Sequence, residues 1–274
     1  MKHQLLSILL CCIVQLSLGQ ALPEKVQEHD FTIGKSVSIA STVLNETRTL
    51  NIYLPQSYTT DSIQKYPVIY LLDGGKDEDF IHISGLVQFG SFSWINMLPE
   101  SIVVGIANVD RKRDFTYPSN NSLDQEEFPT SGGSENFIEF LENEVQPFIN
   151  ATYRATDTKT LIGQSLGGLL ATEILFEKPI LFDHYIIVSP SLWWDDEKLL
   201  DSTPKISENV TSIYIAGGKE GEVMERTAKE LYTLLQKHRS PNTQVYYEFL
   251  EDKTHGDALH MAVYHAFETI FKTK

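Results

Sequence analysis

Cysteine and basic residues are scarce in this chain of 274 residues. Lys and Arg number 22 against 37 Asp and Glu, which gives a formal net charge of −15. Nucleic-acid binding needs a basic surface to contact phosphates, so this charge gives it no electrostatic support. Both cysteines, Cys11 and Cys12, lie near the amino terminus. The rest of the chain therefore has neither a disulfide nor a cysteine nucleophile, and a core of about 250 residues needs no disulfide for stability.

Long apolar runs are also missing, with one exception at residues 5–18. This run follows Lys2 and ends at small residues that alternate along the chain, Ser17, Gly19 and Ala21, which is the pattern of a secretory signal and its cleavage site. It is shorter than the ~20 residues that cross a bilayer. We therefore predict a cleaved signal peptide at 1–19, a single domain at 20–274, no stable membrane insertion, and a periplasmic or secreted location.

The remaining composition is that of a globular chain, with 42% hydrophobic and 11% aromatic residues. No tract is biased, which excludes a collagen-like, coiled-coil or largely disordered protein. Residues 31–40 and 44–54 alternate apolar with polar, which predicts an antiparallel pair of strands with a turn at Asn45-Glu46. The later apolar runs are short and continuous, as in strands buried on both faces. They lie at 68–72, 102–106, 161–162, 185–188, 213–216 and 245–247.

Helical patterns lie between these runs, at 134–148 with Pro147 bending its end, at 166–176, at 223–235 and at 258–271. Strands that alternate with helices predict an α/β fold, in which a mostly parallel sheet is covered on both faces. Residues 111–133, rich in Asp, Ser, Pro and Gly, predict a long surface excursion.

The motif Gly-Gln-Ser-Leu-Gly at 163–167 places Ser165 between a strand pattern and an apolar helix. A nucleophile elbow needs this context, because a sharp strand-to-helix turn exposes the hydroxyl and flanking glycines leave room for the crowded backbone. The alternative is a glycine-rich turn with an unremarkable serine. We predict that Ser165 is a catalytic nucleophile.

A serine hydroxyl needs a base, and in this arrangement the chain order is serine, acid, histidine. His255 follows the strand pattern at 244–250 and lies in a polar loop, whereas His260 and His265 lie inside the last helix. The equal spacing of the three suggests a zinc site. However, five residues turn a helix by ~140°, so the three cannot share one face. We predict His255 as the base and no metal.

The acid is expected in the loop after the strand at 211–216. Glu220 lies nearer the strand end, whereas Glu222 resembles a first-turn residue of the next helix, where the helix dipole favours it. We predict Glu220, with Asp252 and Asp257 as further candidates, and a solvated surface charge as the alternative for each.

Acyl transfer also needs amide donors aimed at the developing oxyanion. The amide of Leu166, which follows the nucleophile, is one expected donor. The second is expected after the strand at 68–72, where two glycines let the backbone approach a substrate, and we favour Gly75 narrowly over Gly74. A plain turn is the alternative at this position.

Together these motifs resemble the putative-esterase family of α/β-hydrolases over residues of about 30 to 271. Siderophore esterases of the enterobactin and salmochelin type are the most similar branch, and feruloyl esterases, S-formylglutathione hydrolases and mycolyltransferases are more distant. The resemblance implies an α/β-hydrolase fold and a catalytic triad at Ser165, Glu220 and His255. It rests on Leu71-Leu72-Asp73-Gly74, on Asn108, Arg111 and Arg113-Asp114, on the Gly-Gln-Ser-Leu-Gly-Gly run at 163–168, on Ser189-Pro190-Ser191-Leu192-Trp193-Trp194, and on His255-Gly256.

Three further residues are candidates for substrate binding. Trp193 and Trp194 follow a strand end, where α/β folds place ligands, although core packing explains them equally well. Arg111 is a candidate for meeting an anionic substrate. Arg113 is more simply explained by an ion pair with the adjacent Asp114 that braces the loop.

The sequence therefore predicts a serine carboxylic-ester hydrolase that forms an acyl-enzyme and acts on a small-molecule ester, such as a siderophore or aromatic ester. No cofactor is required. An acyltransferase to a sugar or lipid acceptor, and a catalytically silent binding protein with the same fold, are the alternatives. The sequence points to no particular protein partner.

Overall fold

Two antiparallel strands begin the fold, as the alternating pattern predicts. The computed structural model describes residues 22–272, so the predicted signal peptide lies outside the described residues. Residues 22–32 contain no helix or strand, and contacts divide the chain after Thr32. In the unit that follows, β1 (Lys35–Ser41) pairs with β2 (Glu46–Tyr53) in a register that joins Lys35 to Ile52.

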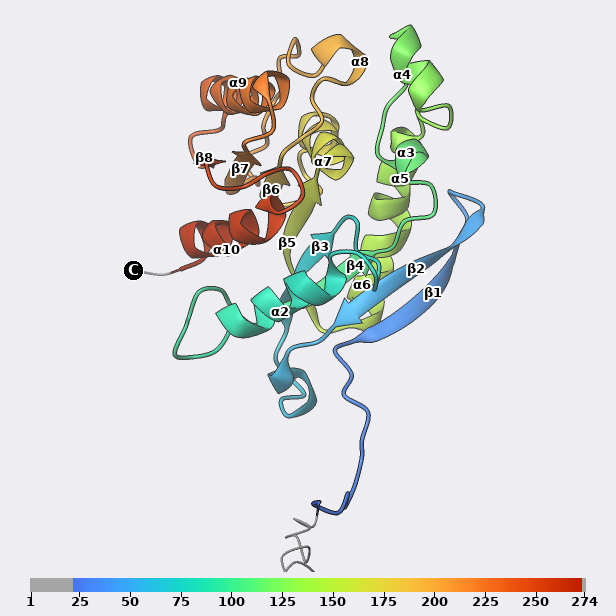
Figure 1. Cartoon of the computed structure of the whole chain (residues 1–274), viewed down its shortest axis with the longest axis vertical. Helices are drawn as coiled ribbons and strands as arrows, with labels where there is room; N and C mark the ends of the chain where they lie inside the picture. Colours follow the sequence, from blue (N-terminus) through green and yellow to red (C-terminus); the bar gives the residue numbers. More distant parts are fainter. Residues whose placement is uncertain (1–21, 273–274) are drawn as a thin grey trace, which may run out of the picture. The chain divides into compact units, whose positions relative to one another are not determined.

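The central sheet has eight strands in the order β1-β2-β4-β3-β5-β6-β7-β8 (Figure 1). β2 pairs with β4 antiparallel, and every later pairing is parallel. β3 has β4 on one side and β5 on the other, so the winding direction of the chain reverses between β3 and β5. In α/β folds, ligands bind at the carboxyl ends of the strands beside such a point. The remaining strands are β3 (Tyr66–Leu71), β4 (Ile102–Ile106), β5 (Ala155–Gln164), β6 (His184–Val188), β7 (Ser212–Gly218) and β8 (Gln244–Leu250).

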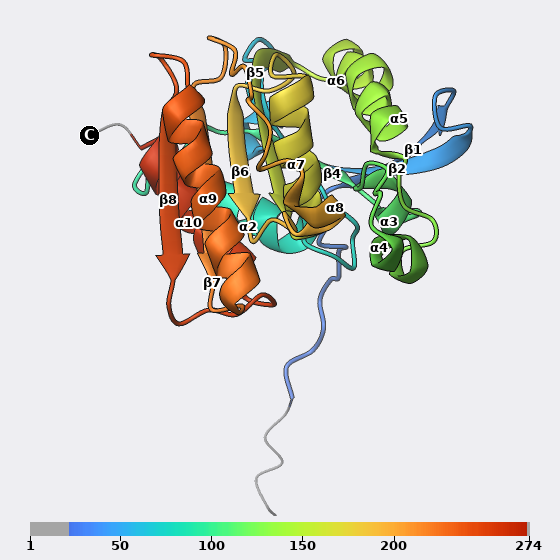
Figure 2. The ribbon, with the colours of Figure 1, turned by 90° about the horizontal axis from the view of Figure 1, so that it is seen from above.

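Helices cover both faces of the sheet, which Figure 2 shows from above. One buried cluster joins the sheet to the helices from α5 to α7 and to α9, and the other joins it to α2 and α10. The main helices are α2 (Phe80–Gly90), α5 (Ser134–Phe140), α6 (Gln146–Thr152), α7 (Leu166–Glu177), α9 (Glu222–His238) and α10 (Ala258–Ile270).

The structure differs in several details from what the sequence predicts. β5 is much longer than the apolar run at 161–162, because polar residues at its start also pair with β3. α2 was not predicted from the sequence. Just before Pro147 the helix widens into a π-helical turn, η2 (Leu141–Val145), because proline offers no amide to the carbonyl one turn earlier. No helix within residues 22–272 is long and apolar enough to span a bilayer.

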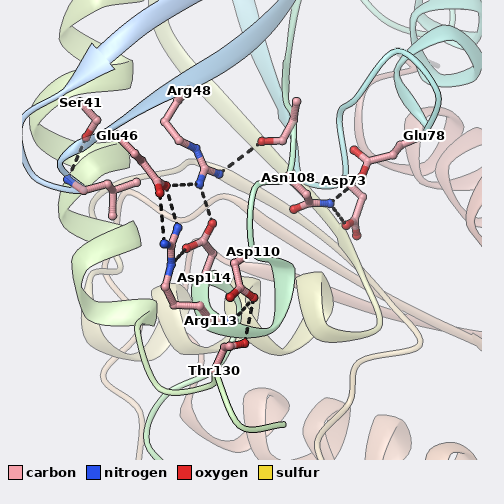
Figure 3. Close-up of polar contacts among 12 residues, drawn as sticks. Ser41, Glu46, Arg48, Asp73, Glu78, Asn108, Asp110, Arg113, Asp114 and Thr130 are labelled. Atoms are coloured by element: carbon pink, nitrogen blue, oxygen red, sulfur yellow. Dashed lines mark hydrogen bonds and ion pairs between the residues drawn. The ribbon is translucent and has the colours of Figure 1, made fainter.

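The excursion at 111–133 is more ordered than a surface loop. It contains two short helices, α3 (Arg111–Asp114) and α4 (Ser122–Glu127). Arg48 of β2 is fully buried and pairs with the equally buried Asp114 at 2.7 Å, and Arg113 joins Asp114 at 2.7 Å, as the sequence predicts. Arg113 also binds Glu46 and lowers the pKa of that carboxyl (Figure 3). The excursion is thus attached to β2 by buried charges.

Asp114→Ala is therefore expected to destabilise the protein by about 3 kcal/mol, because it breaks a fully buried pair and leaves the Arg48 guanidinium with only the partly exposed Glu46, 2.8 Å away, as counter-charge. Urea unfolding followed by circular dichroism measures the change. The matched control is Glu230→Ala, which removes a pair with Arg226 that is 2.8 Å long but exposed. The control should change the free energy of unfolding by less than about 1 kcal/mol. Equal effects of the two substitutions would contradict the anchoring role of Asp114.

Candidate active site

Ser165 occupies a strained turn between β5 and α7. Its φ of 59° and ψ of −121° lie where non-glycine residues are rare. Gly163 and Gly168 make the turn sterically feasible. A Cβ on Gly163 would lie 2.3 Å from the carbonyl oxygen of Gly167, and one on Gly168 would lie 2.9 Å from Cα of Pro190. This geometry has the strand, sharp turn and helix of a nucleophile elbow.

Glu220 and His255 meet across the loops that follow β7 and β8. The Nδ1 atom of His255 lies 2.5 Å from Oε2 of Glu220. The glutamate side chain is 2% exposed and the histidine side chain 48%, so the imidazole faces the open side. The other carboxylate oxygen, Oε1, accepts hydrogen bonds from the Ser189 hydroxyl and from the Gly218 amide. Both oxygens of Glu220 are thus engaged.

These contacts determine the ionisation of Glu220. Burial raises the pKa of the carboxyl, but the hydrogen bond from His255 and those from the two other donors outweigh burial. The pKa is therefore held below its ordinary value. A carboxylate in this state can fix the tautomer of a neighbouring imidazole and stabilise its positive charge.

The other candidate acids lie elsewhere. Glu222 is the exposed first residue of α9, as its alternative interpretation predicts. Asp257 accepts hydrogen bonds from the amide and hydroxyl of Thr254 and does not contact His255. Asp252 is exposed. Of the four candidate carboxylates, the structure brings Glu220 to the imidazole.

The Ser165 hydroxyl shares one open cavity with His255 and Glu220. Within residues 22–272, its hydrogen-bonding contact is the Ser191 hydroxyl at 3.3 Å, and no hydrogen bond joins it to the imidazole. Catalytic hydrogen bonds are often long or unformed before substrate binds. The cavity has a volume of about 530 Å³ and is lined by Ser165, Ser191, Trp193, Lys219, Glu220, Met224, Thr254 and His255.

The two predicted oxyanion donors differ in their environment. Leu166 is the first residue of α7, so its amide has no acceptor within the helix. The Gly75 amide donates to Oε2 of Glu78 at 2.6 Å, and the Gly74 amide donates to the Ile106 carbonyl at 2.9 Å. The Gly74 amide is thus already hydrogen-bonded to β4. The Gly75 amide can donate to a substrate only after its hydrogen bond to Glu78 breaks. Figure 3 shows Glu78 beside Asp73, where both carboxylates accept from Asn108.

The substrate-binding prediction is wrong for Trp194. Its side chain is fully buried, and its indole nitrogen donates to the Tyr117 carbonyl at 2.9 Å, so Trp194 packs in the core. Trp193 is half-buried and lines the cavity. Neighbouring side chains point in different directions here, which a composition pattern does not reveal.

Arg111 does not present a free charge to the cavity. Its guanidinium donates twice to Asp73, at 2.6 and 2.9 Å, and once to the carbonyl of Gln164 at 3.2 Å. The role of Arg111 in binding an anionic substrate stays a prediction, and in this arrangement its charge is paired with Asp73. Arg111 ties the loop after β3 to the residue before Ser165.

Sequence reasoning gave no role to Ser189, Ser191, Glu78 or Gln164. The first two lie in the run after β6 that carries the family resemblance, and that run was the available signal for them. Glu78 lies among several surface carboxylates in sequence and has no distinguishing signal. No group of three or more His, Cys, Asp or Glu side chains within residues 22–272 is arranged to hold a metal ion.

A sheet with two antiparallel strands followed by a parallel set, and a strained serine after the fifth strand, is the α/β-hydrolase fold. A solved structure shares it: the IroE-like serine hydrolase from Shewanella oneidensis matches with a TM-score of 0.77 and 27% identity, over 87% of this chain and 80% of that one.

Within this fold, residues 41–268 match the model of the family described as Putative esterase. The chain belongs to this family and is a carboxylic ester hydrolase. The ferri-bacillibactin esterase BesA of Bacillus subtilis is 32% identical over 229 residues, which are 75% of this chain and 78% of that protein. The siderophore triacetylfusarinine C esterase of Aspergillus fumigatus is 36% identical over 109 residues, 36% of this chain and 37% of that one.

Proposed function

We propose that the protein is a serine esterase in which Ser165 is the nucleophile, His255 the general base and Glu220 the residue that orients the base. The observation that carries the proposal is the 2.5 Å contact between His255 and Glu220 at the cavity that also exposes the strained Ser165. An acid, a base and a hydroxyl grouped in this way perform acyl transfer on several unrelated folds.

The reaction begins when the Ser165 hydroxyl turns from Ser191 towards the imidazole. Nε2 of His255 takes the hydroxyl proton as Oγ attacks the ester carbonyl, and the amides of Leu166 and Gly75 stabilise the oxyanion. For this step Glu78 must give up the Gly75 amide. The imidazolium, held by Glu220, then protonates the departing alcohol. Water attacks the resulting acyl-enzyme with His255 again as base, and the acid is released.

For the substrate, we propose a siderophore ester. The support is that the two relatives named above are siderophore esterases, together with an open cavity of about 530 Å³ that has an aromatic wall at Trp193 and a cation at Lys219. A cavity of that size is within the range of small-molecule sites. We also propose export through the signal at 1–19, so that hydrolysis takes place in the periplasm or outside the cell.

A substrate panel with a covalent probe tests the proposed function. Purified protein should hydrolyse p-nitrophenyl acetate, and siderophore esters should exceed feruloyl, acetyl-sugar and thioester substrates in kcat/KM. A fluorophosphonate probe should label Ser165, located by peptide mass spectrometry. Failure of both hydrolysis and labelling would overturn the serine mechanism. Transfer of the acyl group to an added alcohol in preference to water would instead assign an acyltransferase.

A further inference from the structure

Gln164 connects the end of β5 to the loop after β3 and to the loop after β8. It is the last residue of β5 and pairs with Val188 of β6, so its backbone is held by the sheet. Its carbonyl accepts from Arg111, which binds Asp73 in the loop after β3. Its side-chain amide Nε2 donates to the backbone carbonyl of His255 at 2.6 Å. Gln164 thus links the loop after β3, which carries Gly75, to the loop that carries His255.

The loop that carries His255 has few other attachments. Nearly all of residues 251–257 are exposed. The Lys219 amide donates to the Lys253 carbonyl at 2.6 Å, and the contacts between Thr254 and Asp257 are internal to the loop. Among the hydrogen bonds of residues 22–272, the one from Gln164 is the single bond made by the backbone of His255. Position of the backbone and rotation of the ring are therefore fixed by different partners.

We propose that Gln164 is a positioning residue for the catalytic base: its amide fixes the backbone of His255, while Glu220 fixes the ring through Nδ1. The inference rests on the proposed function, because it gives His255 the role of base. A side chain anchored in a sheet is a rigid support, and catalytic groups need such support to stay within a fraction of an ångström of their working position. A displacement of about 1 Å can cost a factor of 10² in rate.

The chemistry of the contact explains the residue type. The His255 carbonyl only accepts hydrogen bonds, so its partner must donate. A glutamate at position 164 has the same shape as glutamine but, when ionised, only accepts. A histidine there keeps a ring N–H. Gln164→Glu and Gln164→His therefore form a matched pair that differs in the ability to donate.

The test compares the pair with the unsubstituted protein in p-nitrophenyl acetate hydrolysis and thermal unfolding. Gln164→Glu should lower kcat by about 10- to 100-fold with KM changed less than about twofold, because the base is misplaced while the cavity is intact. The added negative charge should also move the acid limb of the kcat/KM profile to higher pH, because it favours the imidazolium. Gln164→His should retain kcat within about fivefold. The Tm values of both variants should stay close to that of the unsubstituted protein.

A second measurement does not depend on turnover. In proton NMR spectra, the Nδ1 proton between His255 and Glu220 should give a downfield signal in the unsubstituted protein and in Gln164→His, and a broadened or shifted one in Gln164→Glu. If the unsubstituted protein hydrolyses no ester, the proposed function fails, and this signal still decides the role of Gln164. If Gln164→Glu matches the unsubstituted protein in kcat, pH profile and proton signal, the positioning role is overturned. A loss of kcat that Gln164→His does not restore, with the signal unchanged, overturns it as well.

Discussion

A Ser165→Ala variant is expected to lose ester hydrolysis by about 10⁴- to 10⁶-fold, because removing one member of such a triad leaves only substrate binding and oxyanion stabilisation to act. The fold should persist. Alanine at φ 59° is strained to the same extent as serine. Among the residues that the structure describes, the hydroxyl that is lost makes one hydrogen-bonding contact, at 3.3 Å to Ser191. The loss is measured as kcat/KM for p-nitrophenyl acetate and as absence of fluorophosphonate labelling.

The matched control is Ser191→Ala, which removes a hydroxyl from the same cavity. A neutral contact at 3.3 Å is weak, so this variant should retain activity within about tenfold and should still be labelled. If Ser165→Ala kept its activity, another nucleophile would be at work and the proposed mechanism would be refuted. If Ser191→Ala lost as much as Ser165→Ala, Ser191 would belong to the reacting groups.

Much of the fold could be predicted because the spacing of apolar residues along the chain reflects which faces of a strand or helix are buried. The alternation at 31–54 predicted β1 and β2, of which β1 is largely exposed and the second half of β2 is buried on both faces. The continuous apolar runs predicted the strands that are buried on both faces. The apolar helix at 166–176 is buried on nearly all sides in α7. α2 was missed because Ser84 and Gly90 interrupt the apolar stripe on its buried face, and its packing against α10 is decided by residues far away in sequence.

The site was predictable only as far as chain order carries information. Ser165 and His255 follow strand ends, and parallel strands bring their carboxyl ends to one edge, so their meeting follows from topology. Contacts between loops do not follow from it. The bonds from Gln164 to His255 and from Gly75 to Glu78 depend on side-chain rotamers, and the burial of Trp194 depends on the carbonyl of Tyr117.

Glu220→Gln is expected to lower kcat by about 10⁴-fold while the stability of the fold changes little by comparison. The orientation of the new side chain follows from its neighbours. Oε1 of residue 220 accepts from the Ser189 hydroxyl and the Gly218 amide, so the glutamine oxygen remains there and its NH₂ group faces His255. That group donates to Nδ1, which forces the proton of the neutral imidazole onto Nε2. An imidazole in this tautomer cannot take the proton of Ser165.

Glu222→Gln, two residues away at the exposed start of α9, is the control and should leave kcat unchanged. The dependence of stability on pH follows from the lowered pKa of Glu220. Because the pKa of Glu220 is lowered from 4.5, its stabilising contribution is present above 4.5 and is lost only as pH falls through the lower folded value. If Glu220→Gln retained full activity with Glu222→Gln unchanged, the contact at Nδ1 would be structural, and Ser165 and His255 would have to work as a pair.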